Sequence, residues 1–588
     1  MKFIPKKYLL LILVFTLLEP LHYYFLINFP LEGRSFIAYD VDESNVITLM
    51  RSVEINFNNP WSTSGEKIYD NPAIGSVYSY LPFGLVRWFF SIDPMLMNIV
   101  SKALLSFITL VLIYKVLEAY LIDKKKANLA FVLFLIPMGL EFVMFPVSLF
   151  SGVEFLGAGF SFEFPFLNSL SRIYYYMPLI TGFLSLLAYN KNKKIITSIF
   201  LGLTFLFYPT FGLVFALVPL FYEVAKNYKT TIPNCLYTSI KSLLLIYIIA
   251  GIFLLPWILN AIQNPDLYKL YKQNSEIFKS HLFSIIGSYF FYFVIIFIAF
   301  YDKIIRYKKT LIVGFVLACI ISLGELQKLH VPYIENVNIP KIILSISEIS
   351  MIAFLFSLIV FLVKSKINPL EKFLSIWVIT LTAMSIVNPT WVLWMPYRVG
   401  YLIKLPLVAL GAIFFSKFMY KMESIKVKKI YVIILIGIIS ISSICIYNYR
   451  FQEGLRRTGF NYYSTDDYLA MKFMNGIERG VVLSSPTINY FLPYISLQNV
   501  LYHPADSQYF GGGNNIEEKK KDTLLFFSGS ISSYKSKEIF NKYNISYVFY
   551  GEKEKLLSNN TLNFSYLTQI YSNNTTQIYS VGGFNETS

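Results

Sequence analysis

Three carboxylates stand close together in the segment Tyr39-Asp40-Val41-Asp42-Glu43. Such a cluster is unusual in a chain of which only 15% of the residues are charged. Helical spacing would bring Asp40 and Glu43 onto one face. Carboxylates in this arrangement act as a general base or bind a divalent cation. The alternative is a solvated acidic patch that caps an interfacial helix, and the segment by itself leaves these readings open.

Three cations are candidates for binding phosphate. Arg398, Arg172 and Lys341 lie at ends of apolar runs that are remote from the lysine clusters. Arginine binds phosphate through two parallel hydrogen bonds, so the two arginines are the stronger candidates. The alternative is that each side chain reaches toward lipid headgroups while its stem stays in the apolar layer.

Four further polar residues are candidates for a ligand-binding or metal-binding role. Asn71 precedes a proline in a turn, and Glu154 and Glu163 lie in a segment rich in Gly and Phe, 151–172. His330 stands alone, and a lone histidine is more often a hydrogen-bonded structural residue than a ligand. None of them has the spacing of a strong metal site, so no cofactor is certain and the metal is unknown.

The elements that must position these residues are membrane spans. The chain has 588 residues, is 55% hydrophobic and has a mean hydropathy of +0.54. Its net charge of +16 would indicate a nucleic-acid partner in a soluble protein. Here Lys and Arg cluster at the ends of apolar runs, as the positive-inside rule expects. We therefore expect a polytopic membrane protein whose partner is the lipid bilayer and not nucleic acid.

The sequence excludes some other classes. Its three cysteines lie within or near apolar runs and indicate no disulfide framework. Neither a P-loop nor a dinucleotide-binding glycine motif is present, which argues against nucleotide-driven transport and hydride transfer.

Apolar runs of suitable length predict about thirteen transmembrane helices, since a span needs about 20 mostly apolar residues. The first run follows a basic start, has no small-residue cleavage site and is read as a retained signal anchor. The predicted spans are 8–29, 95–121, 127–150, 173–189, 195–208, 210–225, 236–259, 281–301, 310–328, 342–363, 373–390, 396–416 and 430–449.

The stretch 195–225 is either one long span or two short ones broken at Tyr208-Pro209-Thr210. Two spans place all basic clusters on one side of the membrane, which the positive-inside rule favours. The N-terminus is then cytoplasmic and the C-terminus extracytoplasmic in the cell membrane. The seven clusters are Lys6/Lys7, Lys124–Lys126, Lys191/Lys193/Lys194, Lys226/Lys229, Lys303/Arg306/Lys308/Lys309, Lys364/Lys366/Lys372 and Lys417–Lys429.

Two predicted domains follow: a transmembrane domain, 1–449, with a first extracytoplasmic loop, 30–94, that carries the acidic motif, and an extracytoplasmic soluble domain, 450–588. In the second we expect a helix over 465–476 that begins at a polar cap and strands over 480–485 and 545–550. This alternation indicates a small α/β domain.

Six glycosylation sequons concentrate in this tail, which agrees with an extracytoplasmic location although its composition is rich in Asn, Ser and Thr. The acceptor residues are Asn544, Asn559, Asn563, Asn573, Asn574 and Asn585.

The order of these features resembles the GT-C superfamily of membrane glycosyltransferases. A first span is followed by a long loop that opens with the D-x-D-E-like motif at Asp40 and continues to the Asn71-Pro72 turn. The stretch from Gly202 to Thr210 is similar to the family's Gly-Leu…His-Pro-Thr element, with Tyr208 in place of His. Arg398 resembles an Arg that follows a late outer loop, and the tail resembles the family's small outer domain.

The resemblance implies transfer of a sugar, with inversion, from a polyprenyl- or dolichyl-phosphate carrier to a glycan, lipid or protein acceptor on the outer face. Asp42 and Glu43 match the family's paired carboxylates and would supply the base, with Asp40 next. Arg398, Arg172 and Lys341 would stabilise the leaving phosphate. Glu163, Glu154, His330 and Asn71 would contact the acceptor or a metal.

Two other functions stay open. A lipid-linked-sugar transporter or flippase would show related halves with broken helices, and we find no internal repeat. A non-catalytic GT-C-fold scaffold is compatible with Tyr208 and with the spacing of the acidic motif. The tail lacks a Trp-Trp-Asp motif, which argues against the oligosaccharyltransferase branch. The sequons and the Ile-, Lys- and Asn-rich composition suggest an archaeal source.

Overall fold

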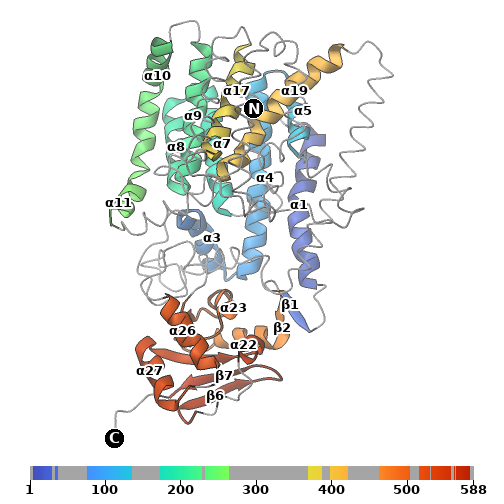
Figure 1. Ribbon diagram of the computed structural model, residues 1–588. Coiled ribbons are helices and arrows are strands. Elements are labelled where there is room, and N and C mark those ends of the chain that lie inside the picture. The colour runs from blue at the N-terminus through green and yellow to red at the C-terminus, as the bar shows by residue number, and fades with distance from the viewer. Residues whose placement is uncertain are drawn as a thin grey trace, which may run out of the picture.

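Helices form one end of the molecule and a mixed α/β unit forms the other (Figure 1). The computed structural model describes residues 4–28, 33–36, 76–135, 173–227, 232–263, 368–386, 397–421, 462–502, 516–529, 531–557, 562 and 564–582.

The helical part is a bundle of long apolar helices. Its elements are α1 (Lys6–Asn28), α3 (Ser76–Phe90), α4 (Pro94–Leu121), α5 (Lys124–Leu135), α7 (Ile173–Asn190), α8 (Lys194–Phe207), α9 (Pro209–Lys226), α10 (Ile232–Ile252), α11 (Leu255–Gln263), α17 (Pro369–Ile386), α18 (Tyr397–Gly400), the 3₁₀ turn η3 (Tyr401–Ile403) and α19 (Lys404–Lys421).

Three of these helices are long and apolar enough to cross a membrane by length and composition alone: α4, α9 and the part of α10 from Asn234 to Ile252. Helices occupy nine of the predicted spans in whole or in part. The predictions for 281–301, 310–328, 342–363 and 430–449 lie outside the described residues, so the total of thirteen stays a prediction.

One predicted span is interrupted. The sequence predicts a continuous helix over 236–259, whereas α10 ends at Ile252 and α11 begins at Leu255. Pro256 lies in the first turn of α11 and has no N–H to donate, so it is compatible with a helix start and not with a helix interior. The prediction of one unbroken helix here is wrong.

The predicted break between α8 and α9 is confirmed. Tyr208 has an extended backbone with φ −157° and ψ 99°, and Pro209 is the first residue of α9. A side chain at Gly212 would overlap Phe205, so the first turn of α9 passes close to the last turn of α8. The Trp257 indole donates to the Leu206 carbonyl at 3.0 Å and satisfies one carbonyl that the helix end leaves open.

Aromatic contacts show which helix ends lie side by side. Tyr120 near the end of α4 stacks on Phe373 at the start of α17 and meets Tyr222 of α9 edge-on. Tyr189 at the end of α7 packs against the same Tyr222. These four helix ends therefore lie together.

Residues of α1, α5 and α19 lie at the same end of the bundle. Tyr8 in the first turn of α1 stacks on Tyr114 of α4, and Phe131 of α5 packs against both rings. Lys417 of α19 pairs with Glu371 of α17. Six of the seven basic clusters thus have described members at or beside one end of the bundle, and the seventh, at 303–309, lies outside the described residues.

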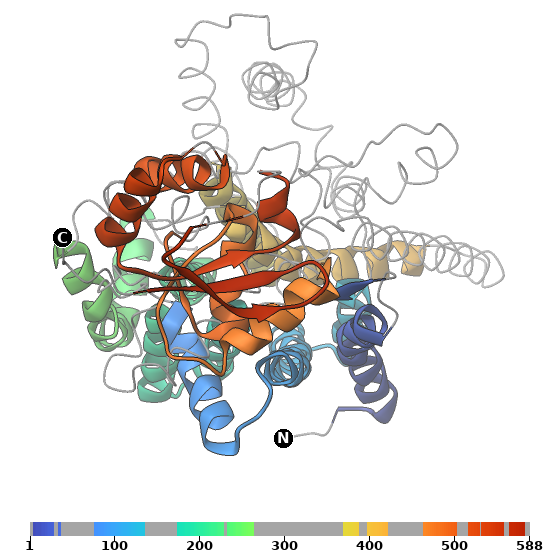
Figure 2. The ribbon, with the colours of Figure 1, turned by 90° about the horizontal axis from the view of Figure 1, so that it is seen from below.

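The C-terminal unit is a sheet between two layers of helices (Figure 2). Its strand order is β4-β3-β5-β7-β6. Strands β4, β3 and β5 are parallel to one another, and β7 is antiparallel to both of its neighbours, β5 and β6. The strands are β3 (Val481–Leu483), β4 (Asn499–Val500), β5 (Ile545–Tyr550), β6 (Leu567–Ser572) and β7 (Gln577–Val581). The helices are α22 (Thr465–Met474), α23 (Pro486–Asn489), α24 (Leu492–Ser496), α26 (Ile516–Phe527), α27 (Ser533–Tyr543) and α28 (Glu552–Lys555).

Alternating strand residues fill a core on each face of this sheet. On β5, Phe549 joins the core made with α22 and α24, whereas Val548 and Tyr550 join the core made with α26 and α27. The predicted helix over 465–476 and the predicted strands at 480–485 and 545–550 are confirmed as α22, β3 and β5.

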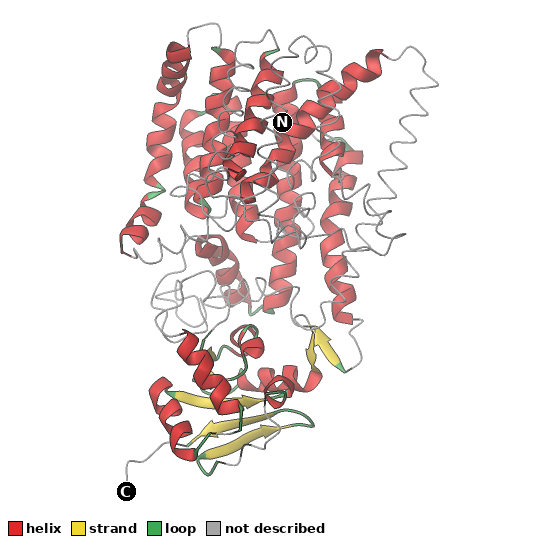
Figure 3. Ribbon diagram, viewed as in Figure 1, coloured by secondary structure: helices red, strands yellow, loops and turns green. Residues whose placement is uncertain are grey.

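A two-stranded ribbon joins the two parts of the molecule. Strand β1 (Arg34–Phe36) directly follows α1 in the chain and pairs antiparallel with β2 (Tyr462–Ser464) at the start of the C-terminal unit. Met95 in the first turn of α4 also packs against the core of the C-terminal unit. Figure 3 shows β1 at the end of α1, beside the C-terminal unit. The lysine-rich ends of the helices lie at the opposite end of the bundle (Figure 1).

Close helix packing in the bundle leads to a first prediction. A Cβ at Gly182 of α7 would overlap the buried ring of Phe215, whereas a Cβ at Gly251 of α10 would meet nothing within 4 Å. Gly182→Ala should therefore destabilise the bundle by about 1–3 kcal/mol through overpacking. Gly251→Ala should be neutral or slightly stabilising because Ala is the better helix former.

Thermal unfolding of both variants in detergent, beside the wild type, measures this difference. Equal unfolding temperatures for the two variants would show that α7 and α9 do not approach as closely as the structure has them.

Candidate active site

Nine of the ten residues that the sequence proposes for the site lie outside the described residues: Asp40, Asp42, Glu43, Asn71, Glu154, Glu163, Arg172, His330 and Lys341. The tenth, Arg398, lies in α18. The structure therefore describes segments that precede or follow these residues in the chain, and the roles of these residues stay predictions.

The start of the first loop is held by backbone pairing with the C-terminal unit. Arg34, Ser35 and Phe36 are opposite Ser464, Tyr463 and Tyr462 in the antiparallel register. The pairing continues at its end, where the Thr465 N–H donates to the Gly33 carbonyl at 3.1 Å. We call the segments 33–36 and 462–465 the β1–β2 junction.

A side-chain ion pair reinforces this junction. The two terminal nitrogens of Arg34 donate to the two carboxylate oxygens of Glu552, each at 3.1 Å. This is the bidentate geometry in which arginine and carboxylate planes match. Glu552 is the first residue of α28, so the pair links β1 to a second element of the C-terminal unit besides β2.

In the sequence, the acidic motif comes shortly after the junction. Asp40 is four residues beyond Phe36, the last described residue of this segment. The carboxylates that the sequence proposes as the base follow directly from the boundary between the bundle and the C-terminal unit.

On the bundle side, the structure brings together the two other elements of the sequence resemblance. The turn α18, which contains Arg398, packs against α17 and α9. At the start of α9, Tyr208 is 2% exposed and its ring packs with those of Tyr175 and Phe211. The break at Tyr208-Pro209 and the arginine turn are therefore both connected to α9, the first in the chain and the second by packing.

Sequence reasoning missed three buried cations of the bundle. Lys404 of α19, Lys102 of α4 and Arg87 of α3 are 3%, 4% and 9% exposed. The ammonium of Lys404 also lies over the ring of Phe134. Burying a cation in an apolar bundle is costly, so such residues usually serve ligand or ion binding. The signal was present in the sequence, because Lys102 and Lys404 fall inside the predicted spans 95–121 and 396–416.

Two buried carboxylates lie behind Glu552 in the C-terminal unit. Asp467 of α22 is fully buried, and its Oδ1 accepts a hydrogen bond from the Thr576 hydroxyl and a longer one, at 3.3 Å, from the Glu552 N–H. Glu554 of α28 is also fully buried and accepts from the N–H groups of Ser485, at 2.6 Å, and Gly551, at 3.0 Å. The chain comes so close here that a side chain at Gly551 would overlap Asp467.

Burial controls the protonation of this pair. It raises the pKa of the Glu554 carboxyl from 4.5 to about 7, with the nearby Asp467 adding to the rise and hydrogen bonds from Ser485 opposing it. Burial likewise raises the pKa of Asp467, against hydrogen bonds from Thr576, Glu552 and Ser464. Burial also raises the pKa of the Tyr463 phenol, with Glu554 and Asp467 contributing. Near pH 7 the two carboxyls are therefore not both fully ionised.

Within the part of the chain that the structure describes, no group of three or more His, Cys, Asp or Glu side chains could hold a metal ion. The proposed carboxylates and His330 lie outside that part, so a divalent cation at the acidic motif stays a prediction.

No protein-family model matches the sequence, and no curated protein matches it. Among solved structures, the apo oligosaccharyltransferase of Archaeoglobus fulgidus is similar with a TM-score of 0.50 and 14% identity, over 92% of this chain and 69% of that one. AglB from the same organism, in complex with an inhibitory peptide and a dolichol-phosphate, gives a TM-score of 0.45 and 13% identity, over 92% of this chain and 69% of that one.

The arabinofuranosyltransferase AftD from mycobacteria gives a TM-score of 0.47 and 11% identity, over 99% of this chain and 40% of that one. At identities this low, structural similarity shows a shared fold alone, and we infer the shared fold from the first match, whose TM-score is 0.50. The chain shares the fold of the Archaeoglobus oligosaccharyltransferase, as expected from the resemblance to membrane glycosyltransferases found in the sequence.

The buried Glu554 leads to a prediction of pH dependence. Because its folded-state pKa of about 7 exceeds the ordinary value of 4.5, the folded unit holds a proton that the unfolded chain releases. Stability should therefore fall as the pH rises from about 4.5 to 7, by on the order of 3 kcal/mol, and should change little through this group above pH 7.5. Glu554→Gln should remove this part of the slope, whatever its effect at any single pH.

Hydrogen exchange of the segment 545–555 in the whole protein, corrected for the intrinsic effect of pH, measures the slope. Glu538→Gln is the matched control, since Glu538 makes an exposed pair with Lys535 on α27. The same slope in Glu554→Gln and the wild type would contradict the assignment.

Proposed function

We propose that the chain is a glycosyltransferase that moves a sugar from a polyprenyl- or dolichyl-phosphate carrier to an acceptor on the outer face of the membrane. The observation that carries the proposal is the GT-C fold, found over 92% of the chain. In the sequence, the acidic motif follows the first helix and strand β1, which is the order that the resemblance requires.

The reaction needs a base and a site for the leaving phosphate. In the proposed step, the carboxylate of Asp42 or Glu43 takes the proton from the acceptor hydroxyl. The acceptor oxygen attacks the anomeric carbon from the side opposite the phosphate, and the bond between that carbon and the phosphate oxygen breaks. The electron pair leaves with the polyprenyl phosphate, and the configuration of the sugar inverts.

Cations near the bundle interior would stabilise the charge that develops on the leaving phosphate. Arg398, Arg172 and Lys341 keep this proposed role, and we add Lys404 and Lys102 because both are buried in the bundle. Lys404 is six residues beyond Arg398 and follows it through α18 and η3. A divalent cation held by the acidic motif would supply similar stabilisation.

The proposed topology places the lysine-rich end in the cytoplasm and the C-terminal unit outside. The gathering of six basic clusters at one end of the bundle, opposite the C-terminal unit, supports this orientation. Among the described sequon residues, Asn544 and Asn574 are exposed, as glycan acceptors need to be. The side chain of Asn573 is instead engaged in hydrogen bonds to its own turn and to the Asp466 carbonyl.

The acceptor is proposed only as a glycan, lipid or protein. The tail of this chain lacks the Trp-Trp-Asp motif, which argues against the oligosaccharyltransferase branch of the superfamily.

One observation favours a second candidate, a non-catalytic scaffold with the same fold. Tyr208 stands where the sequence resemblance expects His, and its ring is packed between Tyr175 and Phe211. Burial among aromatic rings suits a structural role for this position. A transporter or flippase gains no comparable support from the described residues.

The direct test is release of polyprenyl phosphate by protein in lipid bilayers, supplied with a panel of polyprenyl-phosphate sugars. The wild type should release it, and Asp42→Asn/Glu43→Gln should lower the rate by about 10²–10⁴-fold because the base is lost. Glu54→Gln/Glu66→Gln is the matched control in the same loop and should keep wild-type activity.

Unchanged release in the acidic-motif variant would move the base elsewhere, with Asp40 and Glu163 next. No release from any donor, under conditions in which the protein is folded, would favour the scaffold.

A second test concerns the buried lysine at the start of α19. Lys404→Met should lower release by about 10–100-fold, because a charge-assisted contact to phosphate is lost in a low-dielectric site. Lys417→Met is the control on the same helix, since Lys417 pairs with Glu371 at the lysine-rich end. Equal activity of the two variants would remove Lys404 from the donor site.

A further inference from the structure

We propose that the C-terminal unit acts as a positioning element of the active site, with Arg34 and Glu552 as positioning residues that hold the start of the first loop in register. This inference rests on the proposed function and goes beyond it, because it gives a role to a unit that carries none of the proposed catalytic groups.

The contacts are of three kinds and all converge on the same few residues. Backbone pairing fixes the register of β1 against β2, so Ser35 is opposite Tyr463. The Ser35 hydroxyl also donates to the Thr465 hydroxyl at 3.2 Å. The bidentate pair of Arg34 with Glu552 adds an anchor from a different part of the C-terminal unit. A strand of three residues has few hydrogen bonds of its own, so the ion pair restricts its motion substantially.

Glu552 is itself held rigidly. Its N–H donates to Asp467, and the same helical turn is closed by Glu554, which accepts from Gly551 and Ser485. Ser485 follows β3 and Gly551 follows β5, so the turn is attached to the ends of two neighbouring parallel strands. The position of Glu552 is therefore determined by the core of the C-terminal unit.

The ion pair is better suited to orientation than to stability. The side chains of Arg34 and Glu552 are 35% and 34% exposed. Pairs this exposed contribute little to folding because water screens the charges. Two parallel hydrogen bonds nevertheless define an angle as well as a distance. A catalytic group displaced by about 1 Å can lose about 10²-fold in rate, so a small gain in register has a large effect on activity.

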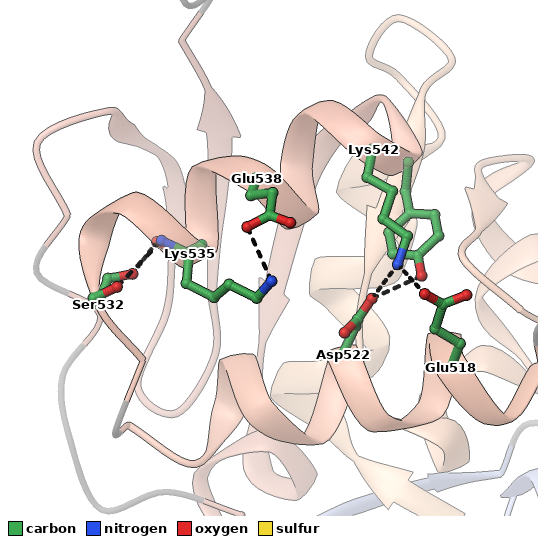
Figure 4. Close-up of polar contacts among 8 residues, drawn as sticks. Glu518, Asp522, Ser532, Lys535, Glu538 and Lys542 are labelled. Atoms are coloured by element: carbon green, nitrogen blue, oxygen red, sulfur yellow. Dashed lines mark hydrogen bonds and ion pairs between the residues drawn. The ribbon is translucent and has the colours of Figure 1, made fainter.

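The test compares Arg34→Ala, Glu552→Ala and the charge-reversed pair Arg34→Glu/Glu552→Arg, all in the whole protein in bilayers. Lys542→Ala is the matched control. Lys542 bridges Glu518 and Asp522 between α27 and α26, on the surface of the same unit and away from the junction (Figure 4). Each variant is measured for kcat, for the KM of the lipid-linked donor and for hydrogen exchange of the segment 33–39.

Both single variants should lower kcat by at least about tenfold with the donor KM changed less than about threefold, and exchange of 33–39 should be faster. The charge-reversed pair should recover a large part of both losses, and Lys542→Ala should match the wild type. Faster hydrogen exchange in β5 and β7 would show that Glu552→Ala disturbs the C-terminal unit as a whole. In that case the positioning role is judged from Arg34→Ala alone, because this variant leaves α28 intact.

Wild-type kcat in the single variants despite faster exchange would overturn the positioning role. A raised donor KM with unchanged kcat would overturn it as well, since the junction would then serve binding. A wild type inactive on every donor would overturn the proposed function and the positioning role together, while the exchange measurement would still show whether the ion pair holds the junction.

Discussion

The pairing of β1 with β2 is the contact on which the relation between the two parts of the chain depends. It joins residues more than 420 positions apart, Arg34 with Ser464, in a strand register only three residues long. Closing so long a loop is entropically expensive, so the pairing needs support from elsewhere. Met95, packed against the C-terminal core, contributes to that support, whereas the pair of Arg34 with Glu552 mainly orients the strand.

Within the bundle, the dominant constraint is that backbone groups in an apolar layer must be satisfied internally. Helices meet it along their lengths, and the breaks show how it is met at their ends. At Tyr208-Pro209 the proline removes one donor, the extended tyrosine reverses the chain, and the Trp257 indole takes up a carbonyl of α8. A break of this kind joins two helices through a short turn while one exposed helix-end carbonyl still has a hydrogen-bond donor.

The charged residues divide into two populations with different physics. Most described lysines at the lysine-rich end are beside helix termini, where a cation can reach water or headgroups at little cost, and Lys372 is a buried exception. Lys102 and Lys404 are buried in the bundle, where a cation is retained only if something negative or polar compensates it. In the C-terminal unit, the buried pair of Asp467 and Glu554 is compensated by backbone N–H groups and by a raised pKa.

The sequence by itself determined the class of the molecule and much of its local structure. Apolar runs and lysine clusters predicted the helices, the Tyr208-Pro209 break and the shared basic end, because hydrophobic length and charge placement are local properties. The strands at 480–485 and 545–550 and the capped helix at 465 were likewise readable from short patterns. The acidic motif and Arg398 were proposed from residue type and order, and their roles remain proposals.

Only the tertiary structure decided what depends on residues distant in the chain. The three-residue strand β1 has no pattern of its own and exists because β2 is available as its partner. The burial of Lys404 and the partnership of Arg34 with Glu552 are consequences of packing between separate helices and strands. A sequence pattern reports what each segment prefers, whereas these features depend on which segments meet, and that is settled by the folded chain.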